Sequence, residues 1–223
     1  MSVPHPLTPA KAGMSGENGG EVLSKPRPSA TPLDPTSLRR DRSSVQSALT
    51  YAIVPVGPAD AAQLARVHVQ AWRESYRGLL PEDYLRRLSA PLHARRWRAR
   101  LLRLDEITLA AESQDGALVA YASGQAAREA HGPFEGEITT LYVLRAAQRI
   151  GLGRALMTGV ARALADRGAH SLVVWVLRDN RRARDFYEGL GGAPAGERDE
   201  MVGGTLAPTV GYRWTDIRKL TEG

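Results

Sequence analysis

The 223-residue chain contains no cysteine and no apolar run long enough to span a membrane. Without cysteine it can form no disulfide, no thiolate metal site and no cysteinyl acyl intermediate. It has no Gly-x-Ser-x-Gly elbow and no His-Glu-x-x-His helix, so serine hydrolase and zinc hydrolase chemistry lack support. We therefore expect a soluble protein that uses no metal, binds no membrane and resides in the cytoplasm.

Aromatic side chains are scarce, at 6% of the chain, and only three of the thirty basic residues are lysines. The net charge of +6 is modest, and aromatic and basic residues do not interleave on a recognisable platform. We therefore expect no nucleic-acid partner.

Residues 1–50 contain seven of the fourteen prolines, eight serines and no aromatic residue. Such a segment buries too little apolar surface to offset the entropy of ordering it, so we expect a disordered tail. It also lacks the apolar core of a signal peptide. The remaining stretch, 51–223, is long enough for one domain with a sizeable core.

The most informative stretch runs from Glu137 to Leu156, where an alternating strand leads through a glycine-bearing turn into a helix. Apolar residues then recur at helical spacing, which predicts a helix from about Gly151 to Gly168. The turn therefore lies at a helix N-terminus, where free N–H groups and the helix dipole favour an anion. A dinucleotide fingerprint would need a third glycine at Leu156, and a Walker loop would need Gly-Lys-Ser/Thr, so neither fits.

A second pattern follows at a short distance along the chain. The apolar run Leu172–Val176 predicts a strand covered on both faces, which completes a strand-helix-strand crossover. A helix then follows with Phe186 and Tyr187 on its apolar face. Asn180 and Tyr187 are seven residues apart, so they lie two turns apart on one side.

The rest of the chain alternates between strand and helix patterns. Asp115-Gly116 is typical of a tight hairpin turn. The further elements that we expect are a strand at Ile53–Pro55, a helix capped by Asp60, a helical region at Glu82–Leu104 broken near Pro91, strands at Ile107–Ala111, Leu118–Gly124 and Glu137–Val143, and a closing pair at Glu200–Leu206 and Thr209–Trp214.

The turn Gln148–Gly153 reads Gln/Arg-x-x-Gly-x-Gly and resembles the acetyl-CoA-binding motif of the GNAT N-acetyltransferase superfamily. The segment Asn180–Tyr187 and the segment Trp72–Pro81 resemble further parts of that family, and the order of elements from Tyr51 to Trp214 matches its fold. The resemblance implies a mixed α/β (α+β) GNAT-like fold. Its central sheet would be mostly antiparallel, with one parallel strand-helix-strand crossover.

The resemblance further implies that acetyl-CoA binds as co-substrate. An ordinary strand-to-helix connection is the other explanation of the turn, and a helix cap and a core aromatic are those of Asn180 and Tyr187. Nearby arginines would neutralise the CoA phosphates or form a solvated basic face. The residues expected to bind the co-substrate are Leu141, Tyr142, Val143, Gln148, Arg149, Gly151, Leu152, Gly153, Arg154, Asn180 and Tyr187.

Amine acetylation needs a base, because an alkylammonium must lose a proton before its nitrogen can attack a thioester. Glu137 is the candidate, since its place in Glu-Ile-Thr-Thr-Leu-Tyr-Val resembles that of the glutamate base in many GNAT enzymes. An exposed strand-edge carboxylate is the other explanation. Glu135 and His131 are weaker candidates.

The departing CoA thiolate needs an acid, and Tyr187 fits by position and because a phenol stays protonated at neutral pH. A backbone N–H at Tyr142 or Val143 would stabilise the oxyanion. Direct attack in a ternary complex is the simplest mechanism. The alternative is a CoA-binding sensor without turnover, which would need neither Glu137 nor Tyr187.

The acceptor is a small-molecule or peptide amine whose identity the sequence leaves open. By resemblance Trp72, Tyr76 and Tyr212 line its pocket, although core packing explains each of them equally well. A final strand at a sheet edge could pair with a second subunit, so a homodimer also stays open.

Overall fold

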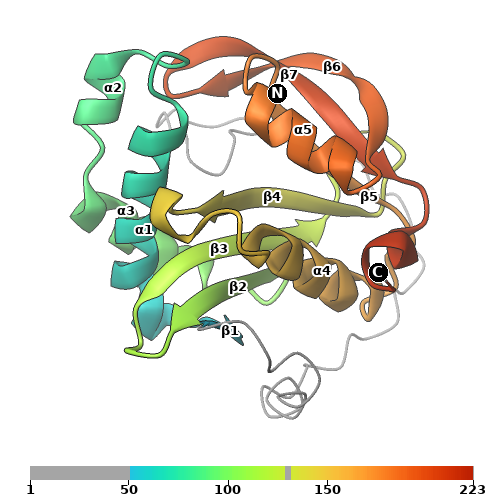
Figure 1. Cartoon of the computed structure of the whole chain (residues 1–223), viewed down its shortest axis with the longest axis horizontal. Coiled ribbons are helices and arrows are strands. Elements are labelled where there is room, and N and C mark those ends of the chain that lie inside the picture. The colour runs from blue at the N-terminus through green and yellow to red at the C-terminus, as the bar shows by residue number, and fades with distance from the viewer. Residues whose placement is uncertain (1–50, 129–131, 223) are drawn as a thin grey trace, which may run out of the picture.

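A twisted seven-stranded sheet forms the centre of the molecule and carries helices on both faces (Figure 1). The computed structural model describes residues 51–128 and 132–222, so the tail expected at 1–50 lies outside the described residues. In chain order the elements are β1 (Tyr51–Pro55), α1 (Ala61–Ser75), α2 (Glu82–Arg86), α3 (Ala90–Arg100), β2 (Glu106–Ser113), β3 (Leu118–Ala126), β4 (Gly136–Val143), α4 (Leu152–Ala165), β5 (Leu172–Leu177), α5 (Arg181–Gly189), β6 (Ala193–Val202) and β7 (Thr205–Trp214).

The strand order is β1-β2-β3-β4-β5-β7-β6, and only β4 and β5 run parallel. Helix α4 makes the crossover between these two strands, and every other neighbouring pair is antiparallel. The predicted fold class, a mostly antiparallel sheet with one parallel crossover, is therefore confirmed.

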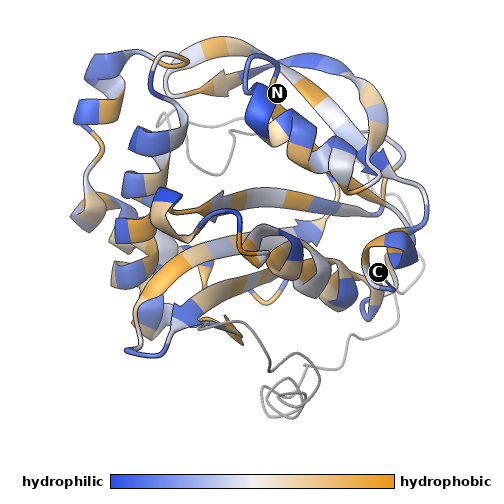
Figure 2. Ribbon diagram, viewed as in Figure 1, coloured by the Kyte–Doolittle hydropathy of each residue, from blue (hydrophilic) through white to orange (hydrophobic). Residues whose placement is uncertain are grey.

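Two apolar layers hold the helices to the sheet. Helix α4 packs on β2, β3 and β4 through a core that includes Leu156, Val160 and Ile138. Helices α1 and α3 pack on each other and on the other face, where Trp97 and Tyr121 are buried. Figure 2 shows polar and apolar residues interleaved along α1 and α4, as expected for helices with one buried side.

Most of the predicted elements agree with the structure. Helix α1 begins after Asp60, but the expected side-chain cap is not formed, because the Asp60 carboxylate accepts from the N–H of Gly57 at 2.8 Å. The predicted break near Pro91 falls between α2 and α3, with Pro91 in the first turn of α3. The strand predicted at Glu200–Leu206 is wrong, because the chain turns at Gly203 and Gly204 between β6 and β7. Strand β6 lies at the sheet edge and is largely polar and exposed, so it carries little of the apolar alternation that marks a strand.

The parallel strands β4 and β5 stay together for only three residue pairs, the last of which joins Ile138 to Val174. Beyond that pair the two strands diverge while both continue in extended conformation. The opening between them holds the candidate site.

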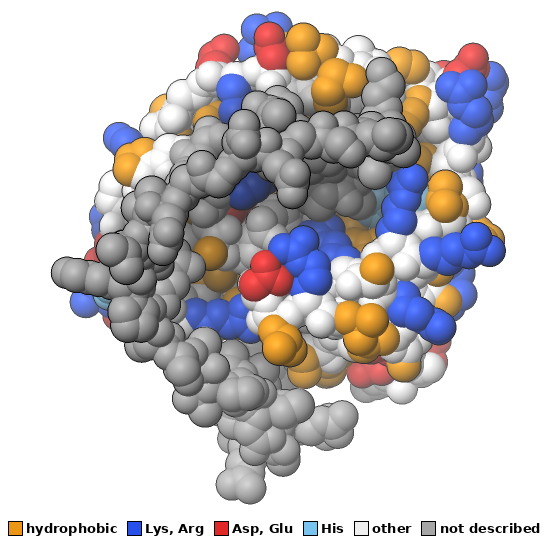
Figure 3. Space-filling model, turned by 180° about the vertical axis from the view of Figure 1, so that it is seen from behind, with side chains coloured by type: hydrophobic (Ala, Val, Ile, Leu, Met, Phe, Trp, Pro, Cys, Tyr) orange, Lys and Arg blue, Asp and Glu red, His pale blue; other side chains and the backbone are white. Residues whose placement is uncertain are grey.

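In Figure 3 the basic side chains that are visible among the described residues of the rear face are separated by apolar and other residues. Within residues 51–128 and 132–222, no helix combines the length and the apolar character needed to cross a membrane. The same part of the chain holds no group of three His, Asp or Glu side chains placed to bind a metal ion.

Candidate active site

A cavity of about 710 Å³ occupies the opening between β4 and β5. One part, which we call the turn half, is formed by the end of β4, the start of α4 and helix α5. The other part, the acceptor half, is formed by α1, β4, β5 and β6. The two halves meet where β4 and β5 separate, so one cavity reaches both.

The turn half is built around the N-terminus of α4. Gly151 is the N-cap and has a φ of 90°, in the left-handed region that favours glycine. Arg149 has a φ of 68° and is the one non-glycine residue with positive φ in the described chain. The first bond closing the helix runs from the N–H of Ala155 to the carbonyl of Gly151 at 3.0 Å, so the preceding amides have no helical partner. Such a turn presents N–H donors and a positive dipole end to an anion.

Gln148 connects this turn to the end of β4. Its Nε2 donates to the carbonyl of Val143 at 2.8 Å, while its buried Oε1 has no hydrogen-bond partner in the described structure. Four cavity-lining arginines surround the turn half: Arg145, Arg149, Arg154 and Arg182. The half therefore combines cations, backbone donors and one free amide acceptor, the groups that a phosphate-bearing ligand with an amide arm requires.

Nearly all the residues expected to bind the co-substrate lie along this cavity. The exception is Leu152, whose side chain is 1% exposed and packs in the core beneath α4, so only its backbone could contact a ligand. The members that line the cavity are Leu141, Tyr142, Val143, Gln148, Arg149, Gly151, Gly153, Arg154, Asn180 and Tyr187.

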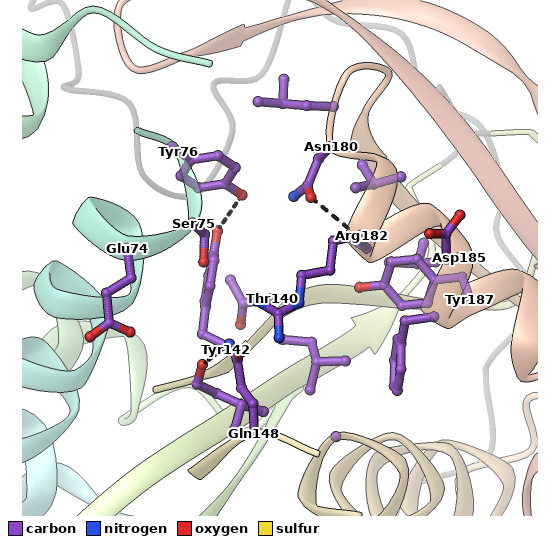
Figure 4. A pocket seen from close by; sticks show the side chains of 18 of the residues that line it. Glu74, Ser75, Tyr76, Thr140, Tyr142, Gln148, Asn180, Arg182, Asp185 and Tyr187 are labelled. Atoms are coloured by element: carbon purple, nitrogen blue, oxygen red, sulfur yellow. Dashed lines mark hydrogen bonds between the residues drawn. The ribbon is translucent and has the colours of Figure 1, made fainter. Parts of the chain in front are cut away.

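Asn180 caps α5 and also lines the cavity. Its Oδ1 accepts from the backbone N–H of Ala183 at 3.2 Å, and the side chain lies at the cavity wall in Figure 4. The capping explanation and the ligand-binding explanation are therefore compatible, because the cap uses only the oxygen and leaves the NH₂ group for a ligand.

Tyr187 is 6% exposed, and its hydroxyl points toward the interior of the cavity in Figure 4. Its ring packs against Phe186, Tyr212 and Trp214, with the centroids 5.3, 5.9 and 6.4 Å away. Burial raises the pKa of the Tyr187 phenol above its usual range. The group is therefore held protonated and can donate a hydrogen bond.

The acceptor half is aromatic. Trp72 and Tyr76 from the end of α1 lie beside Tyr142 of β4, with ring centroids 6.3 and 6.2 Å from that of Tyr142. The hydroxyls of Tyr76 and Tyr142 are 2.9 Å apart. The Nε1 of Trp72 is buried and lacks a hydrogen-bond partner among the described residues. Tyr212 does not line the cavity, because its hydroxyl binds Glu188 at 2.5 Å and Arg184 at 3.0 Å beside α5.

Glu137 is 2% exposed at the start of β4 and does not line the cavity. Arg128 donates to both of its carboxylate oxygens, from Nε at 3.1 Å and from Nη2 at 2.6 Å. The exposed-edge explanation is therefore wrong. Of the weaker candidates, Glu135 is exposed and accepts from the backbone N–H of His170, and His131 lies outside the described residues.

Three carboxylates that no sequence pattern marked as site residues line the cavity, those of Glu74, Asp185 and Glu200. Glu200 lies on β6, on the acceptor side. Arg198 pairs with it and also stacks over the ring of Trp175, with 3.7 Å from its Cζ to the ring centroid. The charge of Glu137 also acts on Arg198, so the carboxylates of Glu137 and Glu200 both lie near this guanidinium. Burial lowers the pKa of Arg198. No sequence signal marked Glu200, because the predicted strand around it had the wrong bounds.

The sequence and the fold both have known relatives. Residues 69–191 match the model of the acetyltransferase (GNAT) family. The uncharacterized N-acetyltransferase YuaI of Bacillus subtilis (strain 168) is 30% identical over 161 residues, which cover 72% of this chain and 91% of that protein. The chain therefore belongs to the GNAT family of N-acetyltransferases, and the predicted membership and acyltransferase class are confirmed.

Solved structures of other acetyltransferases share the fold. The PaiA N-acetyltransferase of Thermoplasma acidophilum, solved in complex with coenzyme A, has a TM-score of 0.58 and 18% identity, covering 74% of this chain and all of that one. YncA of Salmonella typhimurium, solved with its cofactor acetyl-CoA, has a TM-score of 0.56 and 19% identity, covering 75% of this chain and 95% of that one.

Proposed function

We propose that the protein moves an acetyl group from acetyl-CoA to a primary amine by direct attack in a ternary complex. The observation that carries the proposal is the single cavity, whose turn half and acceptor half meet between β4 and β5. A donor on one side and an acceptor on the other can then be in contact without a covalent enzyme intermediate, and the chain has no cysteine to form one.

The turn half fits acetyl-CoA, and the complexes of structurally similar acetyltransferases support this choice. The amides at the start of α4 would hold the diphosphate, with Arg149 and Arg154 neutralising its charge. The free Oε1 of Gln148 and the NH₂ group of Asn180 would bind the amide groups of the pantetheine arm. The thioester supplies an activated acetyl group, and this chain's residues orient it.

Proton removal from the amine is assigned to Glu137 acting through water. Its carboxylate points to the side of β4 opposite Ile138, away from α4, because side chains alternate along a strand. It therefore faces the same side of the sheet as the acceptor half, although it does not line the cavity. Glu200 does line the cavity and is the alternative base, so the two carboxylates need separate tests.

Tyr187 is assigned as the acid that protonates the departing thiolate, since its buried phenol stays neutral and points into the cavity. Backbone N–H groups of β4 beyond Ile138, where β5 no longer pairs, would stabilise the oxyanion. The acceptor is a primary amine carried by a small molecule or a peptide.

The function is tested by CoA release from acetyl-CoA over a panel of amines, amino acids and short peptides. Because the protein has no cysteine, a thiol reagent detects only the released CoA. Calorimetry on the same preparation measures acetyl-CoA binding. Turnover with at least one amine is expected, whereas tight binding of acetyl-CoA with no turnover across the panel would overturn the proposal in favour of a sensor.

A further inference from the structure

A buried ion pair lies behind the acceptor half, outside the cavity. Arg100, the last residue of α3, pairs with Glu106, the first residue of β2, and the two side chains are 9% and 3% exposed. The guanidinium also stacks on Trp97, with 4.6 Å from its Cζ to the ring centroid. A pair this deep costs desolvation free energy, so it calls for a reason beyond stability.

The pair reaches the cavity wall through one hydroxyl. The Nη2 of Arg100 donates to the Oγ1 of Thr139 at 2.7 Å, and that hydroxyl donates in turn to the carbonyl of Ser123 at 3.3 Å. The Thr139 hydroxyl therefore has both a donor and an acceptor partner, which fixes its rotamer. The network joins four elements, α3, β2, β3 and β4.

Thr139 is the extra residue of a β-bulge in β4. Thr140 pairs with Ser123 and Ile138 pairs with Gly124, which leaves Thr139 without a register partner on β3. Pairing with β5 also ends at Ile138. At Thr139 the strand thus loses regular partners on both sides, and both Thr139 and Thr140 line the cavity. Bulges redirect a strand and re-aim its groups, and this one is located at the start of the opening.

We propose that Arg100, held by Glu106, is a positioning residue that fixes the bulge at Thr139 and with it the β4 wall of the cavity. The inference rests on the proposed function, in which this wall lies beside the reacting thioester. Arginine is required because its planar fork can serve a carboxylate and a hydroxyl together, whereas a lysine ammonium is a single point charge on a flexible stem.

The test compares Thr139→Val with Thr139→Ser. Valine keeps the shape but removes the hydroxyl, so kcat should fall about ten- to hundred-fold while the KM for acetyl-CoA changes less than about two-fold. Serine keeps the hydroxyl and should restore most of the turnover. The matched control is Thr108→Val, which removes a buried hydroxyl bonded to the Ser123 hydroxyl at 2.9 Å and does not line the cavity.

Two further measurements make the result decisive. Arg100→Lys should lower kcat like Thr139→Val, and the double variant should be no worse than either single one. Amide hydrogen exchange in the β4 peptide should rise about ten-fold or more in Thr139→Val, and remain unchanged in Thr139→Ser and Thr108→Val. Thr139→Val with wild-type kcat, or with the same loss as Thr108→Val, would overturn the inference.

The inference and the proposed function fail separately. If the wild-type protein acetylates no amine, the proposed function is lost. The hydrogen-exchange comparison still tests whether the Arg100–Thr139 network fixes the bulge. Unchanged exchange of β4 in Thr139→Val would overturn that role without any measurement of turnover.

Discussion

The two halves of the cavity are built in opposite ways. The turn half comes mainly from one short stretch, residues 148–154, and offers backbone N–H groups, a helix terminus and arginines. The acceptor half collects side chains from α1, β4, β5 and β6, which are far apart in sequence, and offers aromatic rings, hydroxyls and the carboxylates of Glu74 and Glu200. The charged end of a ligand can thus be held by backbone groups of one local segment. The groups proposed to act in the reaction, in contrast, come together only when distant parts of the chain fold against one another.

Because the two halves differ in this way, we expect variants in each half to affect a different measured property. Changes at the turn should act on acetyl-CoA binding, because the donors there contact the co-substrate before and after reaction. Changes in the acceptor half and at Tyr187 should act on turnover with little effect on acetyl-CoA binding, because their groups are used when the amine attacks and the thiolate departs.

The largest effect is expected at Gly151. Its φ of 90° strains any residue with a Cβ, and the chain must then reshape the turn whose amides face the cavity. We expect Gly151→Val to weaken acetyl-CoA binding about hundred-fold or more, measured by calorimetry.

Gly168 supplies the matched control for this substitution. It has a φ of 92° in the turn after α4, does not line the cavity, and has open space where a Cβ would be added, as Gly151 does. Gly168→Val should therefore cost similar stability and leave binding unchanged. Equal loss of binding in both variants would show that backbone strain, and not the turn, explains the result.

The next effect separates the two carboxylates of the acceptor side. If Glu137 is the base, Glu137→Gln should lower kcat about hundred-fold, and the deficit should ease as pH rises and more free amine is present. Glu200→Gln should then lower kcat less than ten-fold, measured with the same amine. The reverse order would move the base to the residue that lines the cavity.

A smaller effect is expected from the phenol of Tyr187. Tyr187→Phe removes only the hydroxyl, so kcat should fall about ten-fold with acetyl-CoA affinity unchanged. Tyr212→Phe is the control, since its ring lies 5.9 Å from that of Tyr187 but its hydroxyl binds Glu188 and Arg184 outside the cavity. Equal kcat in both variants would remove Tyr187 from the proposed proton transfer.

The sequence located the turn between β4 and α4 because glycine spacing, strand pattern and helix pattern are all local. It missed Thr139, Thr140 and Glu200 because their positions in the cavity depend on how the strands pair. A bulge is a property of the pairing of β4 with β3, and the face that an edge-strand carboxylate presents depends on where that strand begins.

Dependence on the tertiary structure also explains why the roles of the aromatic residues could not be predicted from the sequence. Trp72 and Tyr76 could be identified in the sequence but not distinguished from core packing, and the structure shows both roles together, with each ring packed and lining the cavity. Tyr212 carried the same sequence signal, yet its strand places the hydroxyl beside α5. Helix and strand order follow from periodicity, whereas the side of the sheet on which a given aromatic hydroxyl ends does not.

The smallest effect concerns the core beneath the acceptor half. His93 is 3% exposed, its ring lies 4.7 Å from that of His68, and burial, with the nearby Arg96 charge, lowers its pKa to about 4. Between pH 6.5 and 4 this histidine is protonated in the unfolded chain but stays neutral in the folded chain. The free energy of unfolding should therefore fall as pH falls, by about 1 kcal/mol per pH unit.

Urea unfolding at pH 6.5 and 5.5 measures this slope, and His93→Leu should flatten it. Because the ring of His68 also contacts Trp72 and Tyr142, the wild-type protein should lose amine turnover in this range before it loses acetyl-CoA binding. His93→Leu should narrow the gap between the two losses. If His93→Leu keeps the full wild-type slope of unfolding free energy against pH, the acid sensitivity arises from other groups. His93 would then not explain an earlier loss of turnover than of acetyl-CoA binding.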